Sequence, residues 1–459
     1  MTCRNSFTTS NRRDFLRRTS AGFGWLALSG LLGESTRAAA AGAHGSPLAE
    51  RAPHFAPKAK RVIFMFMQGG PSHLDMFDWK PALKKADGKG DGKNRLLAPQ
   101  FDYKPRGKSG LMISDLWPEL SKHADDLCLL NGCHTSNAAH PQATIAMHTG
   151  SVTFVRPSMG SWIVYGLGTA NQDLPGFVTI DPANNLGGAQ NYGSAFLPAS
   201  FQGTRISTGA RGIANIANPE MDAKEQRKHL DLVQEMNRGL LARTGANPEI
   251  EGVIESFELA YRMQTSVPNT LDLNKESAAV KEKYGIGSGG TDNFGKQCLM
   301  ARRLAEKGVR FIQVTHRGWD QHNSLQSKLQ QNCGAVDKPV AALISDLKER
   351  GMLEDTLLVW GGEFGRSPQA QDAKGTGRRH NNRGFSMWMA GGGVKGGLRY
   401  GATDETGGTA VEGKIGTHDL HATMLHLLGL NHEKLTYRYA GRDFRLTDVA
   451  GTVVDDIIA

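Results

Sequence analysis

The chain has 459 residues, of which 39% are hydrophobic and 22% are charged, and these values exclude disorder along its whole length. This length fits one large α/β domain or two to three smaller domains. The formal net charge of +9 favours a nucleic-acid partner only if the positive charge lies on the folded surface. Glycine, with 56 residues, exceeds its usual share of about 7%, which predicts many tight loops.

The first 40 residues have the pattern of an export signal. Arg12 and Arg13 precede a Phe-Leu pair, an apolar run over residues 21–32 follows, and small residues lead to Ala40. This order is typical of a twin-arginine signal peptide, and the apolar run is too short for a stable membrane span. We therefore expect recognition by the twin-arginine export machinery, removal of residues 1–40 and a periplasmic or extracellular protein without a stable membrane anchor. The alternative is an amphipathic first helix.

Removal of this segment also removes much of the positive charge. Residues 1–40 contain six arginines and two acidic residues, so the formal charge falls from +9 to +5. So small a charge on a long chain does not favour nucleic acid, and we expect no nucleic-acid partner. Residues 41–60 are interpreted as a linker and residues 61–459 as a single α/β domain.

Apolar segments rich in strand-forming residues predict the sheet of this domain. They cover residues 61–67, 127–130, 177–180, 309–315, 356–360 and 385–390. Helical patterns that end at Gly308 and Gly351 precede two of them, and helix–glycine–strand alternation is typical of a mostly parallel sheet with helices on both faces. Between the third and fourth strands, helical patterns predict an insertion at about residues 205–290. The predicted helices of this insertion cover residues 223–244, 248–264 and 277–284.

The cysteines allow one disulfide, whose formation the sequence does not decide, and they argue against a cysteine-based metal site. Cys128 and Cys133 are close enough in sequence to pair across a turn, and exported proteins can hold disulfides. Cys298 lies in a helical pattern and is interpreted as a buried thiol. No CxxC pair is present, so a cysteine-based metal site is not expected.

Histidine and carboxylate side chains concentrate after the predicted strands. In open α/β sheets, ligands bind beyond the carboxyl ends of the strands. The chemically informative residues in these loops are Gln68, His73, Asp75, Asp78, His134, His140, His148, His316, Asp320, His322, Glu363, Arg366, His380 and His418. Imidazole together with carboxylate is the ligand set of zinc, manganese or iron, whereas calcium prefers oxygen alone. The sequence therefore predicts a divalent-metal site at this edge of the sheet.

Four of these residues show further local signals. Asp320 and His322 are two positions apart, which places both side chains on one side of an extended segment. Glu363 follows Gly361-Gly362, which lets the backbone turn close to a ligand. Arg366 is suited to bidentate contact with phosphate or sulfate.

Structural roles compete for several candidates. Asp75 and Asp78 also fit turn or N-cap positions, and Thr417 or Asp419 fits a cap of the helix predicted over residues 420–428. A capping side chain accepts hydrogen bonds from backbone N–H groups, so its oxygen is not free to bind a ligand.

The remaining histidines divide by position. His421 and His426 lie within the predicted helix and are interpreted as structural or exposed, whereas His73 and His140 lie in short polar loops and are better site candidates. The glycines at 391–393 lack the GxxxxGK[ST] pattern and no GxSxG motif is present, which argues against nucleotide binding and an α/β-hydrolase mechanism.

Several motifs together resemble an exported family called domain of unknown function 1501. These motifs are the twin-arginine leader, QGGPSHLD at 68–75, HPQATIAMHTG at 140–150, GWDQH at 318–322, GGEFGRSP at 361–368 and GGGVKGG at 391–397. That family is similar to the alkaline phosphatase and sulfatase superfamily of metal-dependent hydrolases. The resemblance implies an alkaline-phosphatase-like α/β domain and a divalent metal such as zinc, manganese or calcium.

The resemblance also implies a changed reaction centre. Gln68 stands where the superfamily has an acidic metal ligand, and His140 stands where it has its nucleophile. Glu363, followed by Phe364, stands where an Asp-His pair is expected, and no cysteine has the setting that a sulfatase requires. A metal-activated water would then replace a side-chain nucleophile.

The sequence thus supports the hypothesis of an exported sulfatase- or phosphatase-like hydrolase that acts on an anionic small-molecule or glycan substrate. The expected catalytic residues are His140, Arg366 and His73, and the expected metal ligands are Asp320, His322, Glu363, His418, His380 and Asp75. The alternative is a catalytically degenerate member of the fold that binds sulfated or phosphorylated glycans or a protein partner.

Overall fold

The computed structural model describes residues 47–459 except 210–211, 214–215, 217–219, 246 and 373. The predicted signal peptide and residues 41–46 of the predicted linker lie outside the described residues. Among the described helices, none has the length and apolar character that a membrane crossing needs.

A large sheet forms the centre of the described region, with the strand order β12-β4-β11-β8-β1-β7-β5-β6. Its strands are β1 (Arg61–Met67), β4 (Leu127–Cys133), β5 (Phe177–Ile180), β6 (Thr204–Ile206), β7 (Phe311–His316), β8 (Thr356–Gly361), β11 (Phe385–Ala390) and β12 (Leu398–Tyr400). All neighbouring pairs are parallel except those of β11, which runs antiparallel to β4 and β8. The predicted mostly parallel α/β sheet is confirmed.

Strand β1 lies at the centre of this sheet, between β7 and β8. Val62 pairs with Phe311 on one side and with Leu357 on the other, and all three side chains are buried. A strand that is covered on both faces needs a continuous apolar run, which is why RVIFMFM does not alternate.

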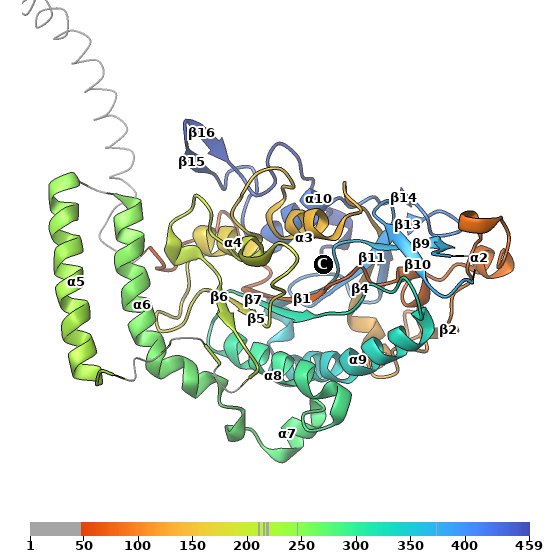
Figure 1. The fold of residues 1–459 in the computed structure, drawn as a ribbon, viewed down its shortest axis with the longest axis horizontal. Coiled ribbons are helices and arrows are strands. Elements are labelled where there is room, and N and C mark those ends of the chain that lie inside the picture. The colour runs from red at the N-terminus through yellow and green to blue at the C-terminus, as the bar shows by residue number, and fades with distance from the viewer. Residues whose placement is uncertain (1–46, 210–211, 214–215, 217–219, 246, 373) are drawn as a thin grey trace, which may run out of the picture. The chain divides into compact units, whose positions relative to one another are not determined.

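Helices cover both faces of the sheet (Figure 1). One face carries α3 (His140–Thr149), α4 (Met159–Leu167) and α10 (Thr417–Leu427), and the other carries α8 (Asp292–Glu306) and α9 (Leu325–Glu349). This arrangement confirms the predicted helix placement.

The predicted helical insertion contains α5 (Ala223–Thr244), α6 (Pro248–Leu271) and α7 (Ala278–Lys283). Helix α5 has the predicted bounds, and its start is defined by a capping box in which Asp222 and Glu225 bond to each other's backbone. Helix α6 runs past its predicted end at residue 264 and packs on α8.

Shorter elements complete the described fold. They are α2 (Pro81–Lys85), the hairpin of β2 (Tyr103–Arg106) and β3 (Leu111–Ser114), the hairpin of β9 (Gly365–Ala370) and β10 (Arg378–Asn381), the pair β13 (Ala402–Thr403) and β14 (Ala410–Glu412), and the hairpin of β15 (Tyr437–Tyr439) and β16 (Arg442–Phe444).

The disulfide that the sequence left open between Cys128 and Cys133 is absent from the structure. Both are free, buried cysteines on the same strand, β4. Five strand residues span roughly 16 Å, whereas a disulfide needs Cα atoms within about 7 Å. Cys298 is a buried free thiol, as predicted.

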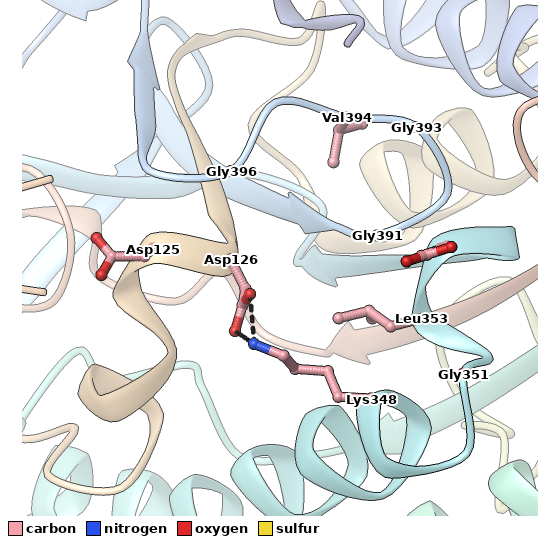
Figure 2. A pocket seen from close by; sticks show the side chains of 10 residues that line it. Asp125, Asp126, Lys348, Gly351, Leu353, Gly391, Gly393, Val394 and Gly396 are labelled. Atoms are coloured by element: carbon pink, nitrogen blue, oxygen red, sulfur yellow. Dashed lines mark hydrogen bonds and ion pairs between the residues drawn. The ribbon is translucent and has the colours of Figure 1, made fainter. Parts of the chain in front are cut away.

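The glycine run at 391–393 has a packing role. It follows β11 and borders a cavity of about 470 Å³ at the end of the sheet where β8 begins (Figure 2). A Cβ atom on Gly391 would lie 2.3 Å from the carbonyl oxygen of Leu353, so the close approach requires glycine. The cation that lines this cavity, Lys348, lies 2.8 Å from both carboxylate oxygens of Asp126.

Two buried histidines lie on α3 and α10, and His421 connects the two helices. The His148 ring donates from Nδ1 to the carbonyl of Thr144 at 2.7 Å, and His421 donates from Nε2 to the carbonyl of Met147 at 2.8 Å. Burial lowers the pKa of His148 to about 4 and the pKa of His421 to about 3. The structural interpretation of His421 is confirmed.

These histidines predict a loss of stability in mild acid. Each is neutral in the folded chain and titrates near pH 6.5 when unfolded, so their contribution is complete above pH 6.5 and is lost as the pH falls toward 4. At pH 5 the expected loss is about 2 kcal/mol per histidine. Urea unfolding of His421→Gln should show a smaller difference between pH 7 and pH 5 than wild type. The exposed control His229→Gln should keep the wild-type difference, and an equal difference in both variants would contradict the assignment.

Candidate metal centre

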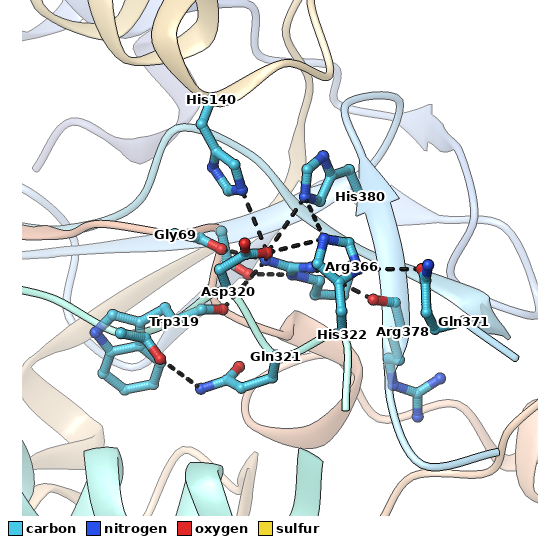
Figure 3. A network of polar contacts seen from close by, with 12 residues as sticks. Gly69, His140, Trp319, Asp320, Gln321, His322, Arg366, Gln371, Arg378 and His380 are labelled. Carbon is cyan, nitrogen blue, oxygen red and sulfur yellow. Dashed lines mark hydrogen bonds and ion pairs between the residues drawn. The ribbon is translucent and has the colours of Figure 1, made fainter. Parts of the chain in front are cut away.

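Loops that leave the carboxyl edge of the sheet bring several predicted residues together (Figure 3). Strand β4 leads to α3, which begins at His140, and β7 leads to the loop with Asp320 and His322. Strand β8 leads to Glu363, and the β9–β10 hairpin supplies His380. Parallel strands end at one edge, which is why segments far apart in sequence meet here.

Three imidazole rings surround one carboxylate oxygen. The Nε2 atoms of His140, His322 and His380 lie 3.3, 3.0 and 3.3 Å from Oδ1 of Asp320. Ligand atoms of His140, Asp320 and His380 all lie within 4.8 Å of one another, close enough to share a metal ion. Figure 3 shows the rings turned toward Asp320.

The hydrogen bonds of two rings define which nitrogen is free. Nδ1 of His322 lies 3.0 Å from Oε1 of Gln371, and Nδ1 of His380 lies 2.8 Å from the carbonyl oxygen of Ala138. Both partners are acceptors, so each Nδ1 carries a proton. The two Nε2 atoms are only 2.8 Å apart and both face Asp320. Each donates a hydrogen bond when it is protonated and offers a lone pair to a metal ion when it is not.

His140 is oriented by a buried carboxylate. Its Nδ1 lies 2.5 Å from Oε1 of Glu363, a side chain that is 0% exposed and also accepts from the backbone N–H of Gly69 at 3.1 Å. Nε2 of His140 is buried, and Oδ1 of Asp320 lies 3.3 Å from it. One carboxylate that orients Nδ1 and a second carboxylate beside Nε2 is an arrangement that suits a metal-binding histidine.

The charge around His140 also favours a cation. Burial by itself lowers the pKa of His140, but hydrogen bonds and charges from Asp320 and Glu363 outweigh it and raise this pKa to about 9. Near neutral pH the metal-free site therefore holds an imidazolium, which means that the surrounding carboxylates stabilise positive charge at this position.

Arg366 holds Asp320 in place. Its Nη2 lies 2.6 Å from Oδ1 of Asp320, and its other donors bind backbone carbonyls, including those of Gly69 and Gly70. The guanidinium is 0% exposed, so contact with a substrate oxyanion would require one of these bonds to break. Hydrogen bonds from His140, His380 and Arg366 outweigh burial and keep the pKa of Asp320 well below its usual range.

The loop after β1 packs against the backbone of the Asp320 loop. Gly69 has φ of +123°, and a Cβ atom there would lie 2.6 Å from the Asp320 nitrogen. The N–H of Trp319 donates to the carbonyl of Gln68 at 3.1 Å. Glycine at this position is therefore what allows the two loops to touch and position Asp320.

Three predicted site residues lie outside this cluster. His73 is buried and its Nε2 lies 3.0 Å from the carbonyl oxygen of Gly407, and burial lowers its pKa. Asp75 forms a fully buried ion pair with Arg378, with 2.9 Å between Oδ2 and Nε. Asp75 thus lies in the turn formed by His73–Asp75, as one alternative predicted, and its carboxylate is engaged in an ion pair rather than in the cluster.

His418 is the third. Its Nε2 lies 2.7 Å from the carbonyl oxygen of Gly150, which follows the end of α3 opposite to His140. The neighbouring Asp419 accepts from the N–H of Gly416 at 2.8 Å, so the predicted capping role of Asp419 is confirmed.

A cavity of about 410 Å³ opens beside the cluster. It is lined by Gln68, Gly69, His140, Asn184, Asn185, Leu186, Arg317, Gly318 and Asp320. Sequence reasoning missed Arg317, although it directly follows β7, and it missed Gln371, which lies in the turn between β9 and β10. The strand-exit rule could have found Arg317, whereas no local signal marks Gln371.

Together, the sheet and the His-carboxylate cluster at its carboxyl edge define an α/β protein with a candidate metal centre. The chain belongs to the family described as Protein of unknown function (DUF1501), whose model matches residues 59–458. This match confirms the resemblance seen in the motifs. No curated protein matches the sequence.

Solved structures similar to this chain include enzymes of the phosphatase and sulfatase type. The lipoteichoic acid synthase LtaP from Listeria monocytogenes has 10% identity and a TM-score of 0.35, with 87% of this chain and 78% of that chain covered. The PsFucS1 sulfatase from Pseudoalteromonas sp. has 12% identity, a TM-score of 0.36 and coverage of 83% and 69%. Alkaline phosphatase from the Antarctic bacterium TAB5 has 8% identity, a TM-score of 0.35 and coverage of 82% and 99%. Similarity at this level carries no argument about activity.

Proposed function

We propose that this protein is a metal-dependent hydrolase of sulfate or phosphate esters, exported by the twin-arginine route to the periplasm or beyond. The observation that carries the proposal is the convergence of three imidazole nitrogens on one oxygen of Asp320, next to a cavity. The leader in residues 1–40 supports the export.

The residues present fit a divalent metal. Asp320, His140 and His380 would hold it, and His322, whose Nε2 lies 3.0 Å from Oδ1 of Asp320, would add a fourth ligand. Three imidazoles and one carboxylate favour zinc or manganese over calcium, which prefers oxygen ligands. Glu363 would orient His140 through its Nδ1 proton.

In this proposal the cluster would hold the metal and the cavity would hold the ester. A bound metal would supply Lewis-acid activation of water and of the ester. Asp320, whose side chain is 46% exposed, lies at the boundary between cluster and cavity, and Arg366 keeps its carboxylate ionised and in place. His140 lines the cavity, so a metal held by its Nε2 would lie within reach of a group bound there.

Metal analysis tests this function. The mature protein, purified without chelator, should contain about one equivalent of metal, and chelator treatment should lower its Tm by a few degrees. His322→Asn should lose the metal, because it removes a ligand nitrogen, whereas the exposed His229→Asn should retain it. Less than about a tenth of an equivalent in wild type, with an unchanged Tm after chelation, would refute the metal-dependent enzyme.

One contact favours a second function, a non-catalytic protein that binds anionic glycans or a protein partner. Oδ1 of Asp320 already accepts from Arg366 at 2.6 Å, so a guanidinium supplies part of the positive charge that a metal would supply. A wild-type protein with less than about a tenth of an equivalent of metal and an unchanged Tm after chelation would favour this second function.

A further inference from the structure

The lining of the cavity beside the cluster contains one acidic residue and one arginine. They are Asp320 and Arg317, the residue after β7. Of the nine residues that line this cavity, Arg317 alone carries a permanent positive charge. The space, about 410 Å³, is within the usual range of a small-ligand site.

The Arg317 guanidinium is bound to the protein through one of its three nitrogens. Its Nη2 donates to the carbonyl oxygens of Asp181 and Pro182, at 3.2 and 2.8 Å. No described residue accepts a hydrogen bond from its Nε or Nη1, and the residue is exposed. A guanidinium that is anchored through Nη2 keeps Nε and Nη1 for a charge-assisted hydrogen bond to an oxyanion, and little side-chain entropy remains to be lost. Arg366, by contrast, is fully buried and bound.

A second observation in the same cavity indicates a ligand. Gln68 lines it, is only 5% exposed, and its Oε1 has no hydrogen-bond partner among the described residues. Its Nε2 lies 3.4 Å from Oδ1 of Asn185, another lining residue. A buried amide oxygen without a donor is unfavourable, and a hydroxyl group of a bound ligand would supply that donor.

We infer that Arg317 binds the sulfate or phosphate group of the substrate, and that the amides of Gln68 and Asn185 bind hydroxyl groups of the same molecule. The substrate class is thus a sulfate or phosphate monoester of a polyhydroxylated compound, such as a sugar. This inference rests on the proposed function for the reaction, but the anion site itself needs no metal.

Binding of inorganic phosphate and sulfate to the full mature chain tests the anion site. Titration calorimetry should give a Kd at least about 10-fold higher for Arg317→Met than for wild type, because the charge-assisted hydrogen bond is lost. Arg317→Lys should fall between them, since it keeps the charge but not the anchored planar head group. Arg399→Met, an exposed arginine on β12, is the matched control and should bind as wild type does.

Ester hydrolysis separates this inference from the proposed function. If wild type hydrolyses aryl phosphate or aryl sulfate, Arg317→Met should raise KM about 10-fold or more while metal content stays at the wild-type level. Unchanged KM and unchanged phosphate affinity in Arg317→Met would overturn the role of Arg317 and leave the hydrolase intact. Phosphate affinity that depends on Arg317 in a chain without metal or hydrolysis would support the anion site and refute the hydrolase. A wild type that neither binds phosphate nor hydrolyses esters would refute both.

Discussion

Asp320→Asn is expected to lower ester hydrolysis about 10³-fold or more and to weaken metal binding by a similar factor. The substitution keeps the shape of the side chain but removes the charge on which His140, His322 and His380 converge. It also leaves Arg366 with carbonyl partners alone. Metal titration of the folded variant, followed by hydrolysis of aryl phosphate and aryl sulfate, measures both effects.

Two comparisons make this result specific to the cluster. Asp173→Asn removes an exposed carboxylate outside the cluster and should keep wild-type metal content and rate. Glu363→Gln keeps a hydrogen-bond acceptor for His140 and should reduce metal affinity by about 10- to 100-fold, less than Asp320→Asn, because it acts through the histidine. Wild-type metal affinity in Asp320→Asn would show that the metal lies elsewhere.

Asp75→Ala is expected to lower the free energy of unfolding by about 3–5 kcal/mol without removing the metal. Asp75 and Arg378 are both 0% exposed, and their ion pair has a 2.9 Å contact. Arg378 also donates to the carbonyls of Leu97 and Ala98, at 2.9 Å each. Loss of the carboxylate leaves a buried guanidinium with no opposite charge. Urea unfolding measures the cost, and metal analysis of the folded protein tests the role that the sequence suggested.

An exposed aspartate gives the matched control. Asp102 pairs with Lys84 at 3.0 Å on the surface, and Asp102→Ala should leave the unfolding midpoint unchanged. If Asp75→Ala instead folded with wild-type stability and lost its metal, Asp75 would be a ligand and the structural assignment would fail.

The strands were predictable because their signal is local. A strand that is buried on both faces must be apolar throughout, and the bounds predicted for β1, β5 and β11 agree with the structure. The three-residue strands β6 and β12 were not predicted, because each is too short to have a clear sequence pattern and pairs with a longer strand, β5 or β4. The direction of β11 was not predicted either, because only the pairing shows that it runs antiparallel to β4 and β8.

The site was predictable in part. Asp320 and His322 were paired from their spacing, and their atoms lie 3.0 Å apart. The backbone between them turns tightly, with i to i−2 hydrogen bonds at residues 321 and 322, rather than extending as predicted. The spacing argument therefore reached the right neighbours through a different local geometry.

By itself, the sequence determined the family, the parallel α/β architecture and the edge of the sheet where histidines and carboxylates gather, because apolar runs, glycine stops and motifs are properties of adjacent residues. The fine-scale features of the site were decided by tertiary structure alone. Which nitrogen of each histidine is free depends on acceptors such as Gln371, and whether a carboxylate can meet a ligand depends on partners such as Arg378, more than 300 positions from Asp75. Hydrogen bonds and charge pairs act over a few ångströms of space, and distance along the chain does not reveal them.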